Sequence, residues 1–223
     1  MDFDLIVFDW DGTLMDSEAR IVNCMRDAFA ELGIEPPARA AVRDVIGLGL
    51  DEAIHRLWPT GSRAGRQGIM TQYRQRFLVS DSTPAPLFEG AAELVQELYD
   101  GGRLLGVATG KSRRGLDEAL AASGLAKWFH ATRCADETFS KPHPAMLEAL
   151  MDELGVSADR TLMIGDTEFD MELAHNAKVA AVAVGYGAHA AERLIAHAPL
   201  ACAMSIDELG EWLRGDLSAP ALD

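Results

Sequence analysis

The chain has 223 residues, 48% of them hydrophobic, and a formal net charge of −15. This length suffices for a large core, and the acidic balance argues against a nucleic-acid polymer as partner, because that binding depends on Lys and Arg. Its three cysteines are widely spaced and indicate neither a disulfide framework nor a zinc site, which fits the reducing cytoplasm. We expect no membrane contact, since no apolar run approaches the roughly 20 residues of a membrane helix.

Short apolar runs predict buried strands at Leu5–Phe8, Leu104–Ala108, Thr161–Ile164 and Ala180–Val184. Helical periodicities before glycines predict helices around residues 91–98, 116–120 and 147–154. A capping box at 205–208 opens a last helix, and the tail from Gly215 is expected to be frayed. The alternation predicts an α/β fold, a Rossmann-like parallel sheet with helices on both faces.

The long stretch between the first two strands contains only helical patterns. Apolar stripes span 21–32, 50–58 and 69–77, with a weaker segment at 40–46. We interpret residues 15–83 as a small all-helical cap domain inserted into a core formed by residues 1–14 and 84–223. Its hinges are expected near 14–17 and 80–86, the latter segment being rich in turn-forming residues.

Polar residues follow the predicted strands at the edge where open parallel sheets bind ligands. These residues are Asp9 and Asp11 after the first strand, Thr109, Gly110 and Lys111 after the second, Lys141 before the third, and Asp166 and Asp170 after it. Carboxylates this close repel one another unless a cation binds between them. Mg²⁺ takes hard oxygen ligands together with water or phosphate oxygens. The set therefore predicts phosphoryl transfer at a magnesium site.

Each of these residue types suits one step of that chemistry. Asp9 is placed to be a nucleophile that forms an acyl phosphate. Asp11, two residues later, is placed to be the general acid and then the base. Thr109, the Gly110 amide and Lys141 suit the phosphoryl oxygens. Asp166 is expected to bind the metal, and Asp170, one helical turn later, to support metal or water.

Four segments in order carry a resemblance to a known family: FDWDGTLMDS, VATGK, SKPHP and MIGDTEFDMELA. They resemble the four motifs of the haloacid dehalogenase superfamily. The helical insertion resembles the cap of one of its subfamilies, and AVAVGYGAHAAERLIAHAP resembles the end of phosphoglycolate phosphatase-like members. The resemblance implies Asp9 as nucleophile, Asp11 as acid and base, Thr109 and Lys141 as phosphate contacts, and Mg²⁺ held by Asp9, Asp166 and the Asp11 carbonyl.

One departure from the family concerns Asn176-Ala177-Lys178, because family members often have glycine after the alanine. If this position needs a positive φ, Lys178 carries strain of about 1 kcal/mol.

Other residues allow two interpretations. Asp16 and Ser17 are expected to be N-cap residues, and Lys111 either points at the phosphate or is solvated. His143 and His175 are expected on the surface or behind the ligands. In the cap, Arg43, Gly47, His55 and Arg56 either recognise the leaving group or belong to a solvated connector.

The preferred function is a Mg²⁺-dependent phosphatase acting on a small phosphorylated metabolite, with phosphoglycolate as the first substrate to consider. The alternatives are a sugar-phosphate mutase of the β-phosphoglucomutase type and a non-catalytic protein that binds phosphorylated ligands. A Schiff-base hydrolase is disfavoured because no lysine lies in the cap, and a dehalogenase is disfavoured because it needs no carboxylate at Asp11. The protein is expected to be a cytoplasmic monomer or homodimer.

Overall fold

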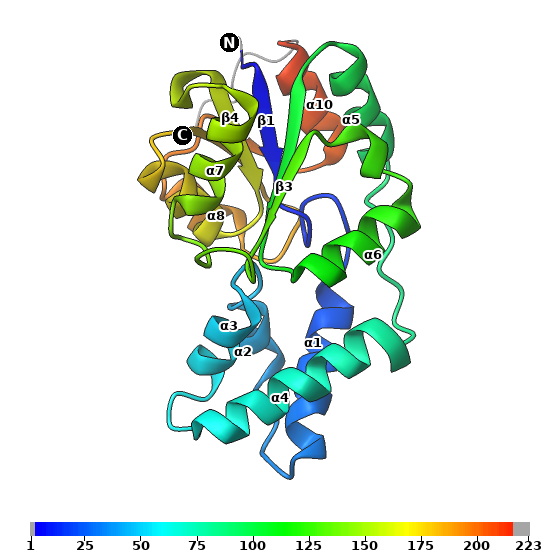
Figure 1. The fold of residues 1–223 in the computed structure, drawn as a ribbon. Helices are drawn as coiled ribbons and strands as arrows, with labels where there is room; N and C mark the ends of the chain where they lie inside the picture. The colour runs from blue at the N-terminus through cyan, green and yellow to red at the C-terminus, as the bar shows by residue number, and fades with distance from the viewer. Residues whose placement is uncertain (1–2, 216–223) are drawn as a thin grey trace.

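A six-stranded parallel sheet forms the centre of the computed structural model, which describes residues 3–215 (Figure 1). The strands lie in the order β3 (Ala131–Cys134), β2 (Leu104–Thr109), β1 (Leu5–Phe8), β4 (Thr161–Gly165), β5 (Ala180–Val184) and β6 (Cys202–Ala203). The expected α/β fold is therefore confirmed. The tail expected to be frayed lies, beyond Gly215, outside the described residues.

The sheet is covered on both faces because its central strands are apolar on both faces. Ile6 and Phe8 of β1 pack toward one group of helices, α5 (Ala91–Asp100), α6 (Arg113–Ser123) and α10 (Ile206–Arg214). Leu5 and Val7 pack toward another, α7 (Ala145–Leu154) and α8 (Glu168–Asn176). Alternation along a four-residue strand thus builds two cores. A short helix, α9 (Ala191–Ile195), covers the end of β5.

Four helices and a π-helical turn lie beyond the carboxyl edge of the sheet, in the lower half of Figure 1. They are α1 (Glu18–Glu31), α2 (Arg39–Arg43), α3 (Leu50–Leu57), α4 (Arg63–Gln75) and η1 (Arg76–Ser80). We call residues 18–80 the helical segment. Its buried side chains form a cluster of their own around Met25, Phe29 and Ile54. This second core follows from the apolar stripes of α1, α3 and α4.

Two strands were not expected from the sequence. β3 reads Ala-Thr-Arg-Cys and has half-buried polar residues at its middle two positions, as an edge strand allows. β6 has only two residues and pairs with the end of β5. Both lie at the edges of the sheet, where one face or one side of a strand stays near solvent and the apolar signal is weak.

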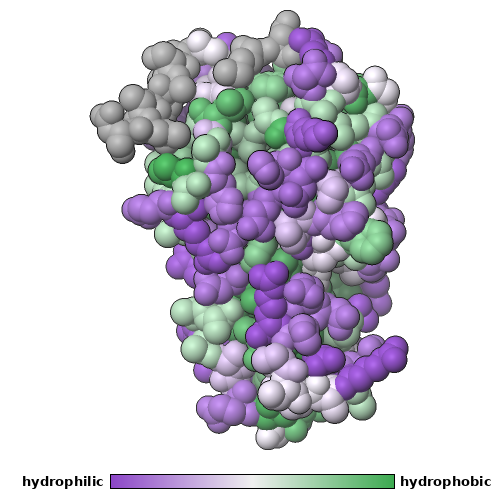
Figure 2. All heavy atoms as spheres, turned by 90° about the vertical axis from the view of Figure 1, so that its left-hand side faces the viewer, coloured by the Kyte–Doolittle hydropathy of each residue, from purple (hydrophilic) through white to green (hydrophobic). Residues whose placement is uncertain are grey.

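The surface carries mainly hydrophilic residues on the face drawn in Figure 2, with hydrophobic residues scattered among them. Within residues 3–215, no helix has both the length and the apolar character needed to cross a bilayer.

Lys178 has a positive φ of 59°, directly after the C-cap residue of α8. This is the position where helices prefer glycine, because a Cβ atom is strained in the left-handed region. The strain foreseen from Asn176-Ala177-Lys178 is thus present in the backbone.

We predict that Lys178→Gly raises the free energy of unfolding by about 0.5 kcal/mol. Relief of left-handed strain, roughly 1–2 kcal/mol, exceeds the entropy that glycine adds to the unfolded chain, roughly 0.4–1 kcal/mol. Urea unfolding of Lys178→Gly beside Lys178→Ala measures the difference. If the two variants are equally stable, backbone strain at residue 178 is not the cause.

Candidate active site

Three loops bring buried carboxylates and a hydroxyl together at the carboxyl edge of the sheet. Asp9 directly follows β1, Thr109 is the last residue of β2, and Asp166 directly follows β4. Each side chain is 1% exposed or less. The edge is shared because β1 pairs in parallel with both β2 and β4.

Lys141 lies between two of the acidic residues. Its Nζ atom is 2.9 Å from Asp9 Oδ1 and 2.6 Å from Asp170 Oδ1, and all three side chains are buried. Burial lowers the pKa of the ammonium, but the charges of Asp170 and Asp9 outweigh burial and raise it above its usual range. Lys141 is therefore a fixed positive charge beside Asp9.

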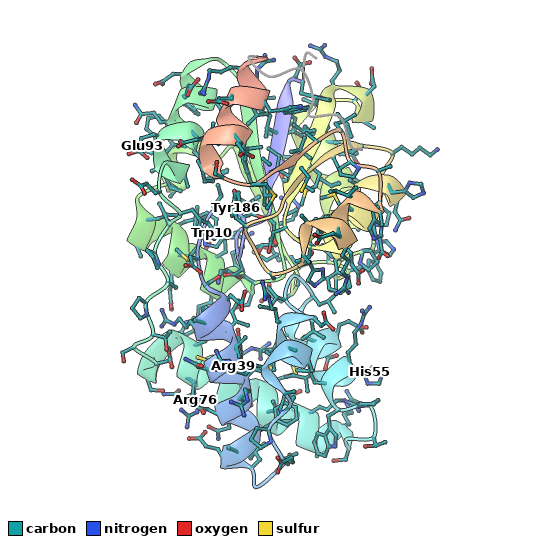
Figure 3. All side chains as sticks on the ribbon, turned by 180° about the vertical axis from the view of Figure 1, so that it is seen from behind. Trp10, Arg39, His55, Arg76, Glu93 and Tyr186 are labelled. Atoms are coloured by element: carbon teal, nitrogen blue, oxygen red, sulfur yellow. The ribbon has the colours of Figure 1, made fainter. Side chains whose placement is uncertain are left out.

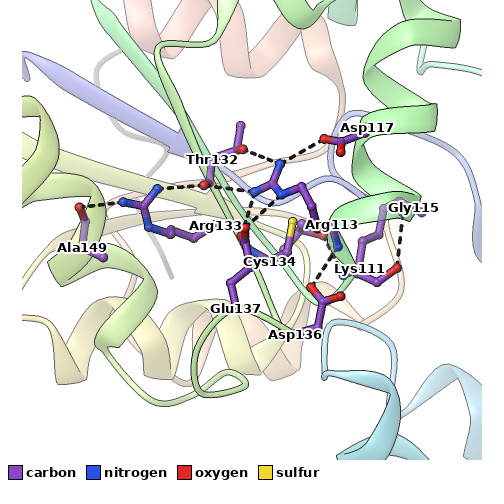
Figure 4. A network of polar contacts seen from close by, with 12 residues as sticks. Lys111, Arg113, Gly115, Asp117, Thr132, Arg133, Cys134, Asp136, Glu137 and Ala149 are labelled. Carbon is purple, nitrogen blue, oxygen red and sulfur yellow. Dashed lines mark hydrogen bonds and ion pairs between the residues drawn. The ribbon is translucent and has the colours of Figure 1, made fainter.

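The loop that carries Lys141 is held by an arginine from α6 (Figure 4). Arg113 donates to both carboxylate oxygens of Glu137, at 3.0 and 2.7 Å, and its backbone amide donates to Asp136. Glu137 in turn accepts from the Cys134 amide at the end of β3. A bidentate contact of this kind fixes direction as well as distance, so residues 134–137 connect β3 firmly to α6.

Asp166 is held by two donors. Its Oδ1 accepts from the Thr13 hydroxyl at 2.9 Å, and its Oδ2 accepts from the Ala188 amide at 2.7 Å. Gly12, with φ of 81°, leaves room for this carboxylate, since a Cβ there would lie 2.1 Å from Oδ2. Burial, followed by the charges of Asp9 and Asp170, raises the pKa of Asp166.

Asp170 contacts both Lys141 and the start of its own helix. Its Oδ2 accepts from the amide and the hydroxyl of Thr167, at 3.0 and 2.7 Å, which forms a capping box on α8. Asp170 therefore caps its own helix and pairs with Lys141 through the same carboxylate, and the second of these contacts was not predicted from the sequence.

The carboxylates fit a divalent cation. Asp9, Asp166 and Asp170 each offer an oxygen, and these oxygens all lie within 4.8 Å of one another. Asp9 Oδ2 is buried and has no hydrogen-bond partner among residues 3–215. Burial, only partly offset by Lys141, raises the pKa of Asp9 to about 7. Three buried carboxylates and the one ammonium of Lys141 leave an excess of negative charge, and this excess suits a hard divalent cation with oxygen ligands.

Asp11 has different neighbours from Asp9. Its Oδ1 accepts from the Ser17 hydroxyl at 2.5 Å and lies 2.9 Å from Lys111 Nζ. Ser17 is the N-cap residue of α1, as expected, but its side chain binds Asp11 and makes no hydrogen bond to the helix. The spacing of Asp11 and Ser17 in FDWDGTLMDS was visible in the sequence, but their contact depends on the tight turn between them.

Lys111 is buried at 9% exposure, in contrast to the solvated position that was one of two expectations. Besides contacting Asp11, its ammonium lies 4.5 Å from the centre of the Phe77 ring, a cation–π contact. Phe77 belongs to η1 of the helical segment. Lys111 therefore connects the acidic residue of the core to the helical segment, a contact that the sequence did not predict.

Two aromatic residues, which Figure 3 labels, support the loop that follows β1. Tyr186 donates its hydroxyl to the Thr13 carbonyl at 3.0 Å, and Trp10 is fully buried. Thr13 also holds Asp166, so this packing supports the acidic cluster.

A glycine-rich loop of the helical segment lies directly against the core. A Cβ on Gly110 would lie 2.5 Å from the Leu48 carbonyl oxygen, and one on Gly47 would lie 2.8 Å from Thr167 Oγ1. The Gly49 amide donates to Ser140 Oγ at 2.8 Å. Gly110, expected as a phosphate-binding amide, thus also permits close approach of two backbones.

The other three cap residues expected near the leaving group have different surroundings. Arg43 donates to the Ala188 carbonyl at 2.7 Å and pairs with Glu18. Arg56 pairs with Glu52 and lies over the Phe169 ring at 5.0 Å. His55 is exposed on the outer side of α3 (Figure 3). Only Gly47 of the four lines the cavity above Asp9 among the described residues.

The two remaining histidines considered from the sequence are both exposed, which agrees with the surface position that was one of two expectations. His143 accepts from the Ala145 amide and stacks on Phe139, and His175 is exposed at the end of α8.

Comparison with known proteins identifies the family of the chain. Residues 6–184 match the model of the haloacid dehalogenase-like hydrolase family. A phosphoglycolate phosphatase of Rhodospirillum rubrum is 32% identical, covering 93% of this chain and 90% of its own. A 5'-nucleotidase of Pseudomonas aeruginosa is 32% identical over 87% of this chain and 88% of its own. The chain therefore belongs to the haloacid dehalogenase-like hydrolases.

Solved structures show the same fold. A hydrolase from Pseudomonas syringae superposes with a TM-score of 0.85 at 22% identity and covers 97% of this chain and all of its own. A haloacid dehalogenase-like protein from Streptococcus pneumoniae superposes with a TM-score of 0.80 at 22% identity, covering 95% and 98%.

The acidic cluster predicts how stability depends on metal. In chelator at pH 8, above the raised pKa of Asp9, Asp9→Asn should be more resistant to urea than the unaltered chain, because it removes a buried charge. Added Mg²⁺ should then stabilise the unaltered chain more than the variant. Asp100→Asn, an exposed change, is the control. Equal Mg²⁺ responses in all three proteins would rule out Asp9 as a ligand.

The glycine contacts predict a second effect. Gly110→Ala should push the 47–49 loop away from the core, because the added Cβ meets backbone oxygens that cannot rotate aside. Hydrogen exchange of the Gly49 amide, protected by Ser140, should become faster by about tenfold. Gly115→Ala, where a Cβ meets only ordinary contacts at 3.4 Å or more, should leave it unchanged. Unchanged exchange in Gly110→Ala would show that the loop does not depend on this contact.

Proposed function

We propose that the protein is a Mg²⁺-dependent phosphatase that hydrolyses a phosphomonoester of a small metabolite through an aspartyl-phosphate on Asp9. The observation that carries the proposal is the pairing of a buried Asp9 oxygen without a hydrogen-bond partner with the fixed ammonium of Lys141. A carboxylate held in this way has one oxygen free to attack phosphorus, while the ammonium offsets the charge of the transferring group.

The metal would be held by Asp9 and Asp166, with the Asp11 carbonyl as the family-implied third protein ligand and Asp170 close behind. When bound, it neutralises the negative charge shared by these carboxylates and the phosphoryl oxygens. Asp166 is suited to this role because its two hydrogen bonds fix its direction before any ligand binds.

Asp11 would transfer the proton. It protonates the leaving oxygen as Asp9 attacks, and it then deprotonates the water that hydrolyses the aspartyl-phosphate. Ser17 and Lys111 both contact Oδ1, so Oδ2 is the oxygen from which the proton would move. These contacts hold the carboxyl group in one direction for both half-reactions.

Thr109 and Gly110 would receive the phosphoryl oxygens. The Thr109 oxygen accepts from the Lys111 amide at 3.2 Å, which leaves its own proton for donation. The side chain is fully buried, so the hydroxyl is held in a water-poor site where such a contact is strong.

The helical segment would be a cap that closes over the substrate, with residues 15–83 as its extent. Support comes from its separate hydrophobic cluster and from the glycine contacts that let it rest on the core. Closure would exclude water from the first half-reaction. The relatives named phosphatases favour hydrolysis over the mutase alternative, and their names make phosphoglycolate and nucleoside monophosphates the first substrates to test.

The direct test is phosphate release from these substrates with Mg²⁺ and with chelator. We predict that Asp9→Asn lowers kcat by roughly 10⁴-fold or more, because no oxygen nucleophile remains, while circular dichroism stays unchanged. Asp16→Asn, an exposed aspartate in the same motif, should retain full activity. Normal turnover by folded Asp9→Asn protein would disprove the nucleophile, and metal-independent turnover would disprove the magnesium site.

A further inference from the structure

The cavity above Asp9 extends far into the helical segment. It has a volume of about 440 Å³ and continues from Asp9 and Thr109 to α1, α4 and η1. Pockets of roughly 300–1,000 Å³ bury ligands of drug size. The two-carbon glycolate group would leave most of this space to water against an apolar wall.

The wall opposite Asp9 is apolar and partly aromatic. It is formed by Ile21, Met25, Val42, Met70, Tyr73 and Phe77. Tyr73 and Phe77 are one turn apart and stack with 5.6 Å between ring centres. Phe77 is also fixed by Lys111 at 4.5 Å and Arg20 at 4.9 Å. The aromatic part of the wall is therefore preorganised, and the methionines beside it adapt to the shape of a ligand.

An exposed aromatic residue lies on the core side of the same cavity. Phe139 is 65% exposed, lines the cavity and stacks on His143 with 4.3 Å between ring centres. A single exposed apolar residue is common on protein surfaces, but this ring borders the cavity and so offers an apolar face to a ligand there. Apolar surface is thus present on both sides of the space that a leaving group would occupy.

The charges of the lining do not suit a second anionic group. The acidic lining residues are Asp9, Asp11, Asp51, Glu52 and Asp136, and the basic ones are Lys111 and Arg74. Lys111 is already bound to Asp11, and Arg74 is exposed, where its attraction is weakened by solvent. A carboxylate buried against the apolar wall would have no fixed partner among the described residues.

We infer that the leaving group of the substrate is bulky and uncharged with an apolar, aromatic face, and that glycolate is a poor fit. The inference rests on the proposed phosphatase function. The Tyr73 hydroxyl has no hydrogen-bond partner among the described residues and lines the cavity, so it is available to one polar atom on such a group.

The test compares benzyl phosphate with phosphoglycolate and glycerol 1-phosphate. All three release a primary alcohol, so their leaving groups have similar reactivity. We expect kcat/KM for benzyl phosphate to exceed that for phosphoglycolate by about tenfold or more, since even one methylene in an apolar pocket changes kcat/KM by roughly 10–200-fold.

Variants locate the effect in the wall. Met70→Ala should lower kcat/KM for benzyl phosphate about tenfold and change that for phosphoglycolate less than about twofold. Met70→Leu should keep the preference because it keeps an apolar side chain of similar volume. Met204→Ala, at a methionine that is 52% exposed and outside the cavity, is the matched control, and thermal unfolding checks that each variant is folded.

The outcomes separate this inference from the proposed function. Metal-dependent hydrolysis in which phosphoglycolate equals or exceeds benzyl phosphate would overturn the inference and leave the phosphatase intact. A rise in the KM for phosphoglycolate in Arg74→Gln would also overturn the inference, because it would show that the cavity binds the glycolate carboxylate. If neither these compounds nor a nucleoside monophosphate is hydrolysed, the proposed function fails. Calorimetric binding of the same compounds with Mg²⁺ then decides the inference, with tighter binding of benzyl phosphate supporting it and equal or weaker binding overturning it.

Discussion

The ammonium of Lys141 between Asp9 and Asp170 is the contact on which the rest of the site depends. A buried carboxylate is costly unless it is paired, and here two of them share one cation. The loop that carries Lys141 is held to α6 through Arg113 and Glu137. Several elements far apart in the sequence therefore serve to keep one positive charge within 3 Å of two negative ones.

The three aspartates at this edge of the sheet, Asp9, Asp166 and Asp170, carry more negative charge than the Lys141 ammonium can offset. Burial, the largest cause, together with the charges of Asp170 and Asp11, raises the pKa of Asp9 to about 7. Such a cluster is poorly stable alone and gains stability from a divalent cation. The fold thus accepts a local cost in stability at the residues that could hold a cation.

The sequence predicted the parts of the fold whose signals are local. β1, β4 and β5 are buried on both faces, so they have continuous apolar runs, and the loops after β1 and β4 carry the expected acidic residues. β3 was not predicted because Thr132 and Arg133 interrupt its apolar pattern. Such a strand forms because it pairs at the edge of the sheet and not because it is hydrophobic, and a single sequence does not show which segment lies at an edge.

The same limit applies within the site. Asp9, Thr109 and Asp166 were placed together correctly, since the ends of parallel strands must converge. The sequence did not predict that Lys111 contacts both Asp11 and Phe77. These contacts depend on how the helical segment packs against the core, which neither periodicity nor spacing reveals. For the same reason, the sequence did not predict where the long side chains of Arg43 and Arg56 point in the helical segment.

Lys111 bridges the core and the helical segment. Its ammonium contacts Asp11 in the core and the ring of Phe77 in the helical segment. If the helical segment moved away from the core, the ring would leave the ammonium, and the surroundings of Asp11 would change at the same moment. The two contacts of Lys111 thus couple the surroundings of Asp11 to the position of the helical segment.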